Sequence, residues 1–452
     1  MKTIAFNFGR KQIAVDVPEE SSVFGMQPVT PLDSPEDKIR AALENPDGTP
    51  PLSRIVRDKL QANPRPKAVV VISDDTRPVP YRGPEGILFP VIDILTGAGI
   101  KPENIRILVA TGTHLPMSEP ELGRILDPRV MSLGIPILNH DCRDITSMTT
   151  VGRTDLAGEV RINSTYMESD IKILTGLVES HFMAGASGGR KSLCPGLMGE
   201  NTTAVIHGGA ILQSPMAADL VLKGNPVHEE TLKVARMAGC DFIVNATLDS
   251  RYRLSGVFAG DLEQAHLRAV EKIKAYVGFT ANGEYDLVIS HGGYVGTNHY
   301  QTAKAAVICS SMLKKEGFCV LASDHSVSEP IGGENYRSML RLLGELGAEK
   351  YENTITGIDW TFVPEQWQPQ MWARLFRKIP PESLYYCSLE IPAEDFAWIP
   401  GLDARTLCPG TIDLAELTQA AVESARRTLR SRLGREPEIA VLKDGPYAIP
   451  IR

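Results

Sequence analysis

The stretch KAVVVISDDTRPVP, residues 67–80, begins with apolar, mostly β-branched residues and ends in charged residues and prolines. A short apolar run bounded by turn residues is typical of a strand buried on both faces, as in a parallel sheet. Three further runs share this pattern, and the helix-like segment GILFPVIDILTGAG (86–99) separates the first two strands: IRILVAT (105–111), IKILTGL (171–177) and DFIVNAT (241–247). The chain is therefore predicted to have an α/β fold with mainly parallel sheets.

A second series of the same kind follows the polar stretch FTANGEYD, residues 279–286. It reads as strand, helix and strand: DLVIS (286–290), YQTAKAAVICSSMLKKEG (300–317) and FCVLAS (318–323). We therefore predict two α/β domains, residues 1–275 and 276–452, with the active-site cleft between them. The final strand is left open to return to the first domain.

Composition narrows the class of protein. The 452 residues are 43% hydrophobic, and 47 basic against 55 acidic residues give a net charge of −8, which disfavours nucleic-acid binding. The seven cysteines form no C-x-x-C pair, so we expect reduced thiols rather than a zinc ribbon or a disulfide framework. Residues 1–18 alternate like a hairpin, and no run approaches the roughly 20 apolar residues of a membrane span. We expect a cytoplasmic protein.

Polar side chains follow three of the predicted strands. Asp74 and Arg77 come after the first, His114 after the second and His181 after the third. Ligands of open α/β sheets bind at the carboxyl ends of the strands, so these positions are candidate site residues. The alternatives are a local Asp74–Arg77 salt bridge and structural roles for the lone histidines.

The stretch HFMAGASGGRKSLCPG, residues 181–196, is close to a phosphate-binding P-loop. Gly185, Lys191 and Ser192 fit that signature, but Arg190 occupies its second glycine, where the backbone must close on the phosphates. A kinase or NTPase thus remains an alternative that is disfavoured, as does a non-catalytic nucleotide-binding module.

Stereochemical inversion needs one proton-transfer group on each face of the substrate, and His114 and His181 are candidates for that pair. His207 lies sixteen residues beyond Lys191. No Cys or carboxylate stands at a spacing that completes a zinc site with it, so a metal bound there needs mostly non-protein ligands.

Together these segments resemble the nickel-dependent lactate racemase family. The resemblance rests on DDTRP, TGTH, HFMAGASGGRK, His207, NHYQTAK and EQWQPQ, which occur in that order along most of the chain. It implies a nickel-pincer nucleotide, nickel bound to a pyridinium-3-thioamide-5-thiocarboxylic acid mononucleotide, which is absent when the host lacks its maturation proteins. By resemblance Lys191 attaches this group covalently and His207 binds nickel. The phosphate is expected on the backbone amides of Ser187, Gly188 and Gly189, with Asp74 also at the cofactor.

The resemblance also implies the reaction. The hydride on C2 of a 2-hydroxy acid passes to the cofactor and returns on the other face, while His114 and His181 act as acid and base. Substrate-binding residues matching the family are Arg77, Tyr300, Gln301, Lys304 and Trp367, and Asp74 is expected to orient Arg77. Trp360 is close enough in sequence to compete with Trp367.

Several questions stay open at the level of sequence. The substrate is a small 2-hydroxycarboxylate such as lactate or malate, and neither its identity nor the oligomeric state follows from one chain. His228, Cys194, His291 and His299 are weaker candidates, for which structural roles are the alternative.

Overall fold

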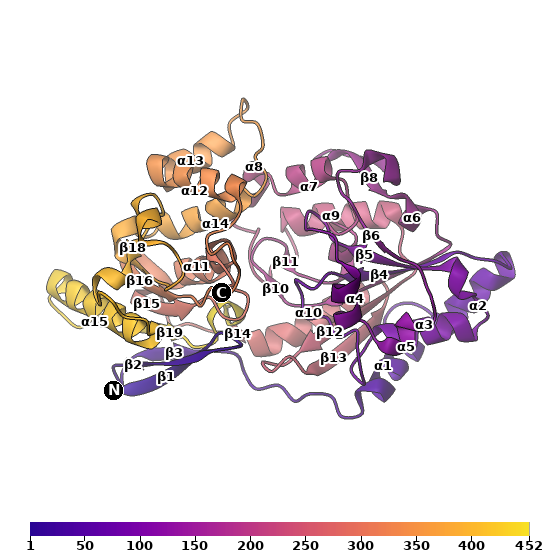
Figure 1. Ribbon diagram of the computed structural model, residues 1–452, viewed down its shortest axis with the longest axis horizontal. Helices are drawn as coiled ribbons and strands as arrows, with labels where there is room; N and C mark the ends of the chain where they lie inside the picture. Colours follow the sequence, from indigo (N-terminus) through magenta and orange to yellow (C-terminus); the bar gives the residue numbers. More distant parts are fainter. Residues whose placement is uncertain (452) are drawn as a thin grey trace. The chain divides into compact units, whose positions relative to one another are not determined.

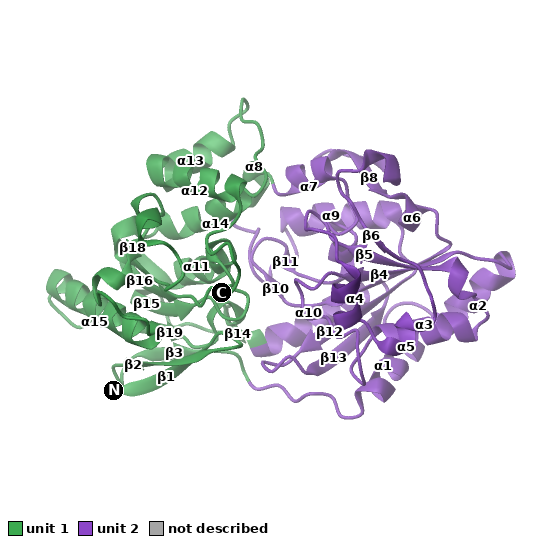
Figure 2. Cartoon of the chain, in the orientation of Figure 1, with its two compact units in different colours: residues 1–27, 208–213, 277–452 green, residues 28–207, 214–276 purple. Residues whose placement is uncertain are grey.

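The computed structural model describes residues 1–451, which divide into two compact units (Figure 2). Unit 2 comprises residues 28–207 and 214–276, and unit 1 comprises residues 1–27, residues 208–213 and the described residues from 277 onward. The predicted division was a single cut near residue 275. The structure differs because β3 (Ser22–Phe24) pairs in parallel with β19 (Ile439–Leu442), which brings the first residues of the chain into unit 1.

Unit 2 is built on a six-stranded sheet in the order β13-β12-β9-β4-β5-β6 (Figure 1). Its strands are β4 (Ala68–Ser73), β5 (Ile105–Ala110), β6 (Ile137–Asn139), β9 (Ile171–Leu177), β12 (Phe242–Leu248) and β13 (Leu254–Gly260). All neighbours run parallel except β13, which is antiparallel to β12. The four strands predicted from apolar runs are confirmed, each within one residue at either end.

Helices α1 (Pro35–Glu44), α2 (Leu52–Ala62) and α3 (Leu88–Gly97) cover one face of this sheet. Their apolar residues, such as Leu43 and Val91, share a buried cluster with Val70 and Ile107 of the sheet. The other elements of unit 2 are α4 (Glu119–Ile125), α5 (Pro128–Met131), β7 (Met148–Thr154), β8 (Gly158–Asn163), α6 (Ser164–Met167), β10 (Ser180–His181), β11 (Gly185–Ala186), α7 (Glu200–Ile206), α9 (Pro226–Ala238) and α10 (Gln264–Val277). Helices α1, α2 and α3 therefore pack on this face of the sheet through apolar side chains.

Unit 1 contains a second six-stranded sheet, in the order β18-β17-β16-β15-β19-β3, with every pair parallel. Its further strands are β15 (Tyr285–His291), β16 (Leu313–Ala322), β17 (Leu384–Cys387) and β18 (Leu402–Asp403). Its helices are α8 (Gly209–Leu212), α11 (His299–Met312), α12 (Glu334–Leu346), α13 (Ala348–Ile355), α14 (Trp367–Phe376) and α15 (Leu414–Leu433). The predicted helix 300–317 ends earlier, because Leu313 already begins β16.

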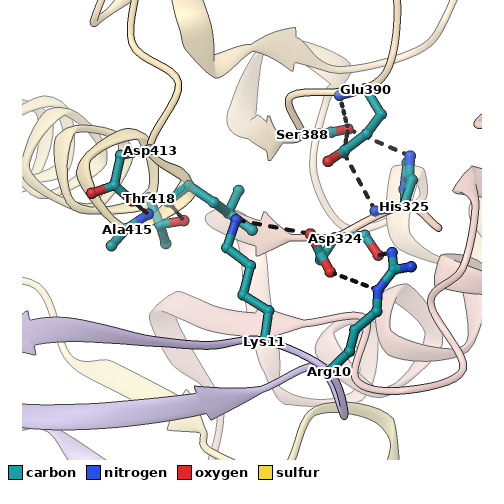
Figure 3. Close-up of polar contacts among 10 residues, drawn as sticks. Arg10, Lys11, Asp324, His325, Ser388, Glu390, Asp413, Ala415 and Thr418 are labelled. Atoms are coloured by element: carbon teal, nitrogen blue, oxygen red, sulfur yellow. Dashed lines mark hydrogen bonds and ion pairs between the residues drawn. The ribbon is translucent and has the colours of Figure 1, made fainter.

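The predicted N-terminal hairpin is confirmed as β1 (Lys2–Asn7) and β2 (Gln12–Val17), which pair antiparallel. Its apolar side chains share a buried cluster with α15 and the sheet of unit 1. Arg10 and Lys11 in its turn form ion pairs with Asp324, which follows β16 (Figure 3). The hairpin is thus fastened both by apolar burial and by charge.

The last strand of the described chain, β20 (Ile449–Pro450), pairs with β14 (Gly278–Phe279) within unit 1. The final strand therefore does not return to the first domain. No helix within residues 1–451 combines the length and the apolar composition needed to cross a bilayer.

Candidate functional site

Three neighbouring strands of unit 2 carry the predicted polar residues at their ends. β9, β4 and β5 lie side by side and run parallel, so their carboxyl ends meet at one edge of the sheet. Asp74 and Arg77 follow β4, His114 follows β5, and His181 ends the short strand after β9. These residues therefore come together at the edge where open α/β sheets bind ligands.

Asp74 and His114 form a close polar pair at this edge. The Nδ1 atom of His114 lies 2.6 Å from Oδ2 of Asp74, and the carboxylate also accepts hydrogen bonds from the Thr76 amide and hydroxyl. Burial alone would raise the pKa of Asp74, but the hydrogen bond and charge of His114 and the bonds from Thr76 outweigh it and hold that pKa below 3.8. The ionised carboxylate fixes the imidazole, which is 53% exposed.

Arg77 is placed differently from the prediction. Its guanidinium donates to the Thr76 carbonyl oxygen at 2.9 Å, and its ion pair, at 4.0 Å, is with Glu179. The expectation that Asp74 orients Arg77 is therefore wrong, as is the alternative of a local Asp74–Arg77 salt bridge. The physical reason is that the carboxylate points to the imidazole of His114, which follows the neighbouring strand β5, and the Thr76 amide and hydroxyl also donate to it.

His181 and Lys191 meet although ten residues separate them. The Nε2 atom of His181 lies 3.1 Å from Nζ of Lys191. On the other side of the ring, Nδ1 accepts hydrogen bonds from the amides of Met183 and Ala184 at 3.3 and 3.2 Å. Because β10 and β11 pair His181 with Gly185, the chain folds back and brings the lysine to the histidine.

The backbone of Ser187, Gly188 and Gly189 forms the turn before Lys191. Gly188 and Gly189 have φ of +73° and +51°, values that favour glycine. The Ser187 amide donates to the Glu179 carbonyl, and the Gly189 amide donates to Oδ1 of Asn245, each at 2.9 Å. The protein itself uses both of these donors in this structure, and their contact with a phosphate stays a prediction. Of the three amides, only that of Gly188 has no acceptor within residues 1–451.

His207 ends α7 and has its tautomer fixed by the backbone. Its Nδ1 lies 2.9 Å from the Thr203 carbonyl oxygen, which can only accept, so Nδ1 carries the proton and Nε2 the lone pair. Burial first, and then the positive charge of Lys191, lower its pKa to about 4. The imidazole is therefore neutral at pH 7, the form that binds metal ions. Residues 1–451 contain no group of three or more His, Cys, Asp or Glu side chains arranged to hold a metal.

The predicted substrate-binding residues of unit 1 lie on two helices. Tyr300, Gln301 and Lys304 belong to the first turns of α11, and Trp367 begins α14. The indole Nε1 of Trp367 donates to the Tyr300 hydroxyl at 2.8 Å, whereas Trp360 donates to Gln366. Trp367 is therefore the tryptophan that belongs with this group.

The weaker candidates are buried, and two of them, His291 and His299, have side-chain hydrogen-bond partners. His299 packs against Trp372 and bonds to the Tyr336 hydroxyl, and His291 bonds to the Lys443 carbonyl. Burial lowers the pKa of His291 to about 4 and, with nearby arginines, that of His228 to about 3. Burial also raises the pKa of the Cys194 thiol, so that thiol is protonated at pH 7.

Three residues of this region are absent from the sequence-based set. Asn245 accepts from the Gly189 amide, Nε2 of His266 lies 2.8 Å from the Ser187 carbonyl, and Arg190 lies beneath the turn. Asn245 and His266 stand in β12 and α10, at positions where nothing in the sequence marks a contact. The only signal at Arg190 in the sequence is that it occupies the second glycine position of a P-loop signature.

Known proteins share this architecture. Residues 8–219 match the family described as lactate racemase N-terminal domain. The lactate racemase of Thermoanaerobacterium thermosaccharolyticum is 30% identical over 382 residues, which are 83% of this chain and 86% of that protein. The lactate racemase of Lactiplantibacillus plantarum is 31% identical over 344 residues, 76% of this chain and 78% of that protein.

Solved structures agree. The lactate racemase apoprotein from Thermoanaerobacterium thermosaccharolyticum superposes with a TM-score of 0.84 at 26% identity and covers 100% of both chains. A Thermotoga maritima protein shares the fold with a TM-score of 0.63 at 15% identity, over 93% of this chain and 99% of that one. The resemblance noted in the sequence is confirmed: the chain belongs to the lactate racemase family and is an isomerase of the racemase and epimerase class.

Proposed function

We propose that the protein inverts C2 of a 2-hydroxy acid. One observation carries this proposal: two histidines, each oriented by its own partners, follow β5 and β9, which flank β4 at one edge of the sheet. Asp74 fixes His114, and the amides of Met183 and Ala184 fix His181. Inversion needs two proton-transfer groups that serve opposite faces of one carbon, and these two side chains are proposed to be those groups.

The hydrogen bonds leave one nitrogen of each ring, Nε2, for proton transfer. Because Asp74 is an ionised acceptor, Nδ1 of His114 carries the proton and its Nε2 can take one. Nδ1 of His181 accepts from two amides, so Nε2, which lies 3.1 Å from the Lys191 amine, is the atom through which this ring would exchange a proton. One histidine is proposed to act as base and the other as acid, and the assignments exchange when the reaction runs in reverse.

The resemblance proposes two cations for the substrate carboxylate, the guanidinium of Arg77 in unit 2 and the ammonium of Lys304 in unit 1. Tyr300 and Gln301 are proposed to contact the substrate beside Lys304, because they share its end of α11. Trp367 holds the Tyr300 hydroxyl through its indole N–H and so keeps that phenol in one orientation.

The residues present fit a nickel-pincer nucleotide. Lys191 offers an amine for the covalent link, and the neutral His207 presents the lone pair of Nε2, the form that coordinates nickel. When bound, this group supplies the acceptor and donor of the C2 hydride. Gly188 offers one amide to its phosphate, and Asp74 acts near it through His114 rather than as a direct ligand.

Loading of this group is proposed to depend on separate maturation proteins. The substrate is proposed to be a small 2-hydroxycarboxylate. Lactate is the first compound to test, because both curated relatives are named lactate racemase. Malate is the second compound to test. Its additional carboxylate would require a further cation in the substrate site.

The test is to produce the protein together with the cofactor-maturation proteins and offer it single-enantiomer 2-hydroxy acids. Chiral chromatography should show the opposite enantiomer accumulating for at least one acid, without net oxidation. If loaded protein inverts none of the panel, while covalent cofactor and nickel are both present, the proposed substrate class is wrong.

A further inference from the structure

Arg190 is among the largest fully buried side chains of the protein, with 1% of its surface exposed. Burial lowers its pKa to about 9, which still leaves the guanidinium charged at pH 7. A buried charge is normally compensated by a carboxylate, because desolvation costs several kcal/mol. None of the ion pairs found within residues 1–451 includes Arg190, and the Cys194 thiol beside it is protonated.

The guanidinium is instead bound by its own loop. It donates from Nη2 to the Ala184 carbonyl at 2.7 Å and from Nη1 to the Ala186 carbonyl at 3.1 Å. Its Nε atom lies 3.3 Å from the Thr231 hydroxyl on α9. Residues 184–186 therefore fold around the guanidinium, which anchors them to the helix below.

Arg190 is connected through the backbone to both His181 and Lys191. Gly185, between the two carbonyl groups that Arg190 holds, pairs with His181 across β10 and β11. Lys191 is the next residue along the chain, and its amine lies 3.1 Å from Nε2 of His181. Arg190 thus lies between the backbone that carries the histidine and the backbone that carries the lysine.

The two histidines near Arg190, His228 and His266, carry no positive charge of their own at pH 7. Burial first, and then the charge of Arg190, lower the pKa values of His228 and His266 to about 3, so both rings are neutral at pH 7. Nε2 of His266 lies 2.8 Å from the Ser187 carbonyl and donates to it, so its 3.5 Å contact with Arg190 is not a hydrogen bond. His266 therefore supports the same turn from another side.

We propose that Arg190 is a positioning residue whose buried guanidinium holds residues 184–186 and thereby sets the separation of His181 and Lys191. The importance of that separation for catalysis rests on the proposed function, whereas the ordering of the loop does not. General stability is a poor reason for a charge here, because apolar side chains often replace buried charges without loss.

The test uses chemical rescue. In the Arg190→Ala protein, isolated without cofactor, amide hydrogen exchange is measured for peptides covering residues 180–189 and for β5 as internal reference. Loop exchange should rise by on the order of 10-fold or more, the equivalent of one lost charged hydrogen bond, while β5 is unchanged. Guanidinium ion at tens of millimolar should restore slow exchange. Urea, a neutral molecule of similar shape, should not.

Two further variants complete the design. Arg190→Lys keeps the charge but reaches fewer carbonyl groups, so it should show intermediate loop exchange even if Arg190→Ala does not fold. Arg236→Met is the control, because Arg236 is an exposed arginine of the same unit that pairs with Glu263. Its loop exchange should equal that of the parent protein.

A second measurement connects the loop to function: intact mass gives the fraction of protein in which Lys191 carries the covalent cofactor. The loaded fraction of Arg190→Ala should fall on the order of 10-fold and recover with guanidinium. Unchanged loop exchange in both Arg190→Ala and Arg190→Lys, or equal rescue by urea, would overturn the proposal. Failure of the parent protein to load would instead count against the proposed function, and the rescued loop would still support the role of Arg190.

Discussion

Nε2 of His181 and Nζ of Lys191 lie 3.1 Å apart, at the two ends of a loop folded around a buried arginine. The contact joins the residue proposed to move a proton to the residue proposed to hold the cofactor. A change at either position therefore affects a shared structure, and experiments must separate attachment from proton transfer.

The first prediction concerns attachment. Lys191→Ala should abolish the covalent adduct, and Lys191→Arg should do so as well, because its guanidinium retains the charge but cannot form the same thioamide. His207→Ala should keep the adduct and lose nickel, since Nε2 of His207 is the proposed ligand. Intact mass and metal analysis distinguish these outcomes. An adduct on Lys191→Ala would show that the attachment site lies elsewhere.

The two histidines should each be required for turnover. His114→Ala and His181→Ala are expected to slow racemisation by roughly 10²–10⁴, the usual contribution of a positioned acid or base. Each variant should still attach cofactor, and the two should prefer opposite enantiomers in a single turnover followed by absorbance. Leu115→Ala, a change at the 84% exposed neighbour of His114, is the control. Full activity in either loaded histidine variant would exclude the two-base mechanism.

Asp74 should give stability that depends on pH. Its pKa is below 3.8 in the folded protein, so its contribution is fully present above pH 3.8 and is lost as the pH falls through the folded value. Asp74→Asn should lower the free energy of unfolding by about 1–3 kcal/mol at pH 7, the range for hydrogen bonds to charged groups. Urea denaturation at several pH values measures the difference, which should shrink toward pH 3. The exposed Asp75→Asn should show no such trend.

Gly189→Ala tests the turn before Lys191. A Cβ atom there would lie 2.8 Å from the His266 ring, and φ is +51°. Gly134→Ala is the matched control, because φ is +66° there and nothing lies within 4 Å of the added atom. Thermal unfolding should show Gly189→Ala to be less stable than Gly134→Ala by about 1–3 kcal/mol, the usual cost of overpacking. Equal stability losses would show that the His266 contact relaxes freely.

Trp367→Phe should weaken substrate binding with little effect on the fold. The change removes the hydrogen bond to the Tyr300 hydroxyl but keeps most of the aromatic surface. A neutral hydrogen bond contributes about 0.5–1.5 kcal/mol, so KM should rise by up to about 10-fold. Trp360→Phe, which loses only its bond to Gln366, is the comparison. Steady-state kinetics of loaded protein should show a KM effect confined to Trp367→Phe.

Local patterns in the sequence were enough to predict the strands and the edge that carries the site. Continuous apolar runs predicted β4, β5, β9 and β12 within a residue, because a strand buried on both faces is mostly apolar. The order of polar residues after those strands then placed His114 and His181 at one edge. The N-terminal hairpin was also visible from its alternation.

Only the tertiary structure decided which partner each polar group takes. Asp74 bonds to His114, which follows the neighbouring strand β5, rather than to Arg77, and the Ser187 and Gly189 amides bond to other groups of the protein. Membership of residues 1–27 in unit 1 depends likewise on the pairing of β3 with β19. Such contacts join residues far apart in the chain, and nothing in the local sequence encodes the distance between them, whereas a strand is encoded by its own side chains.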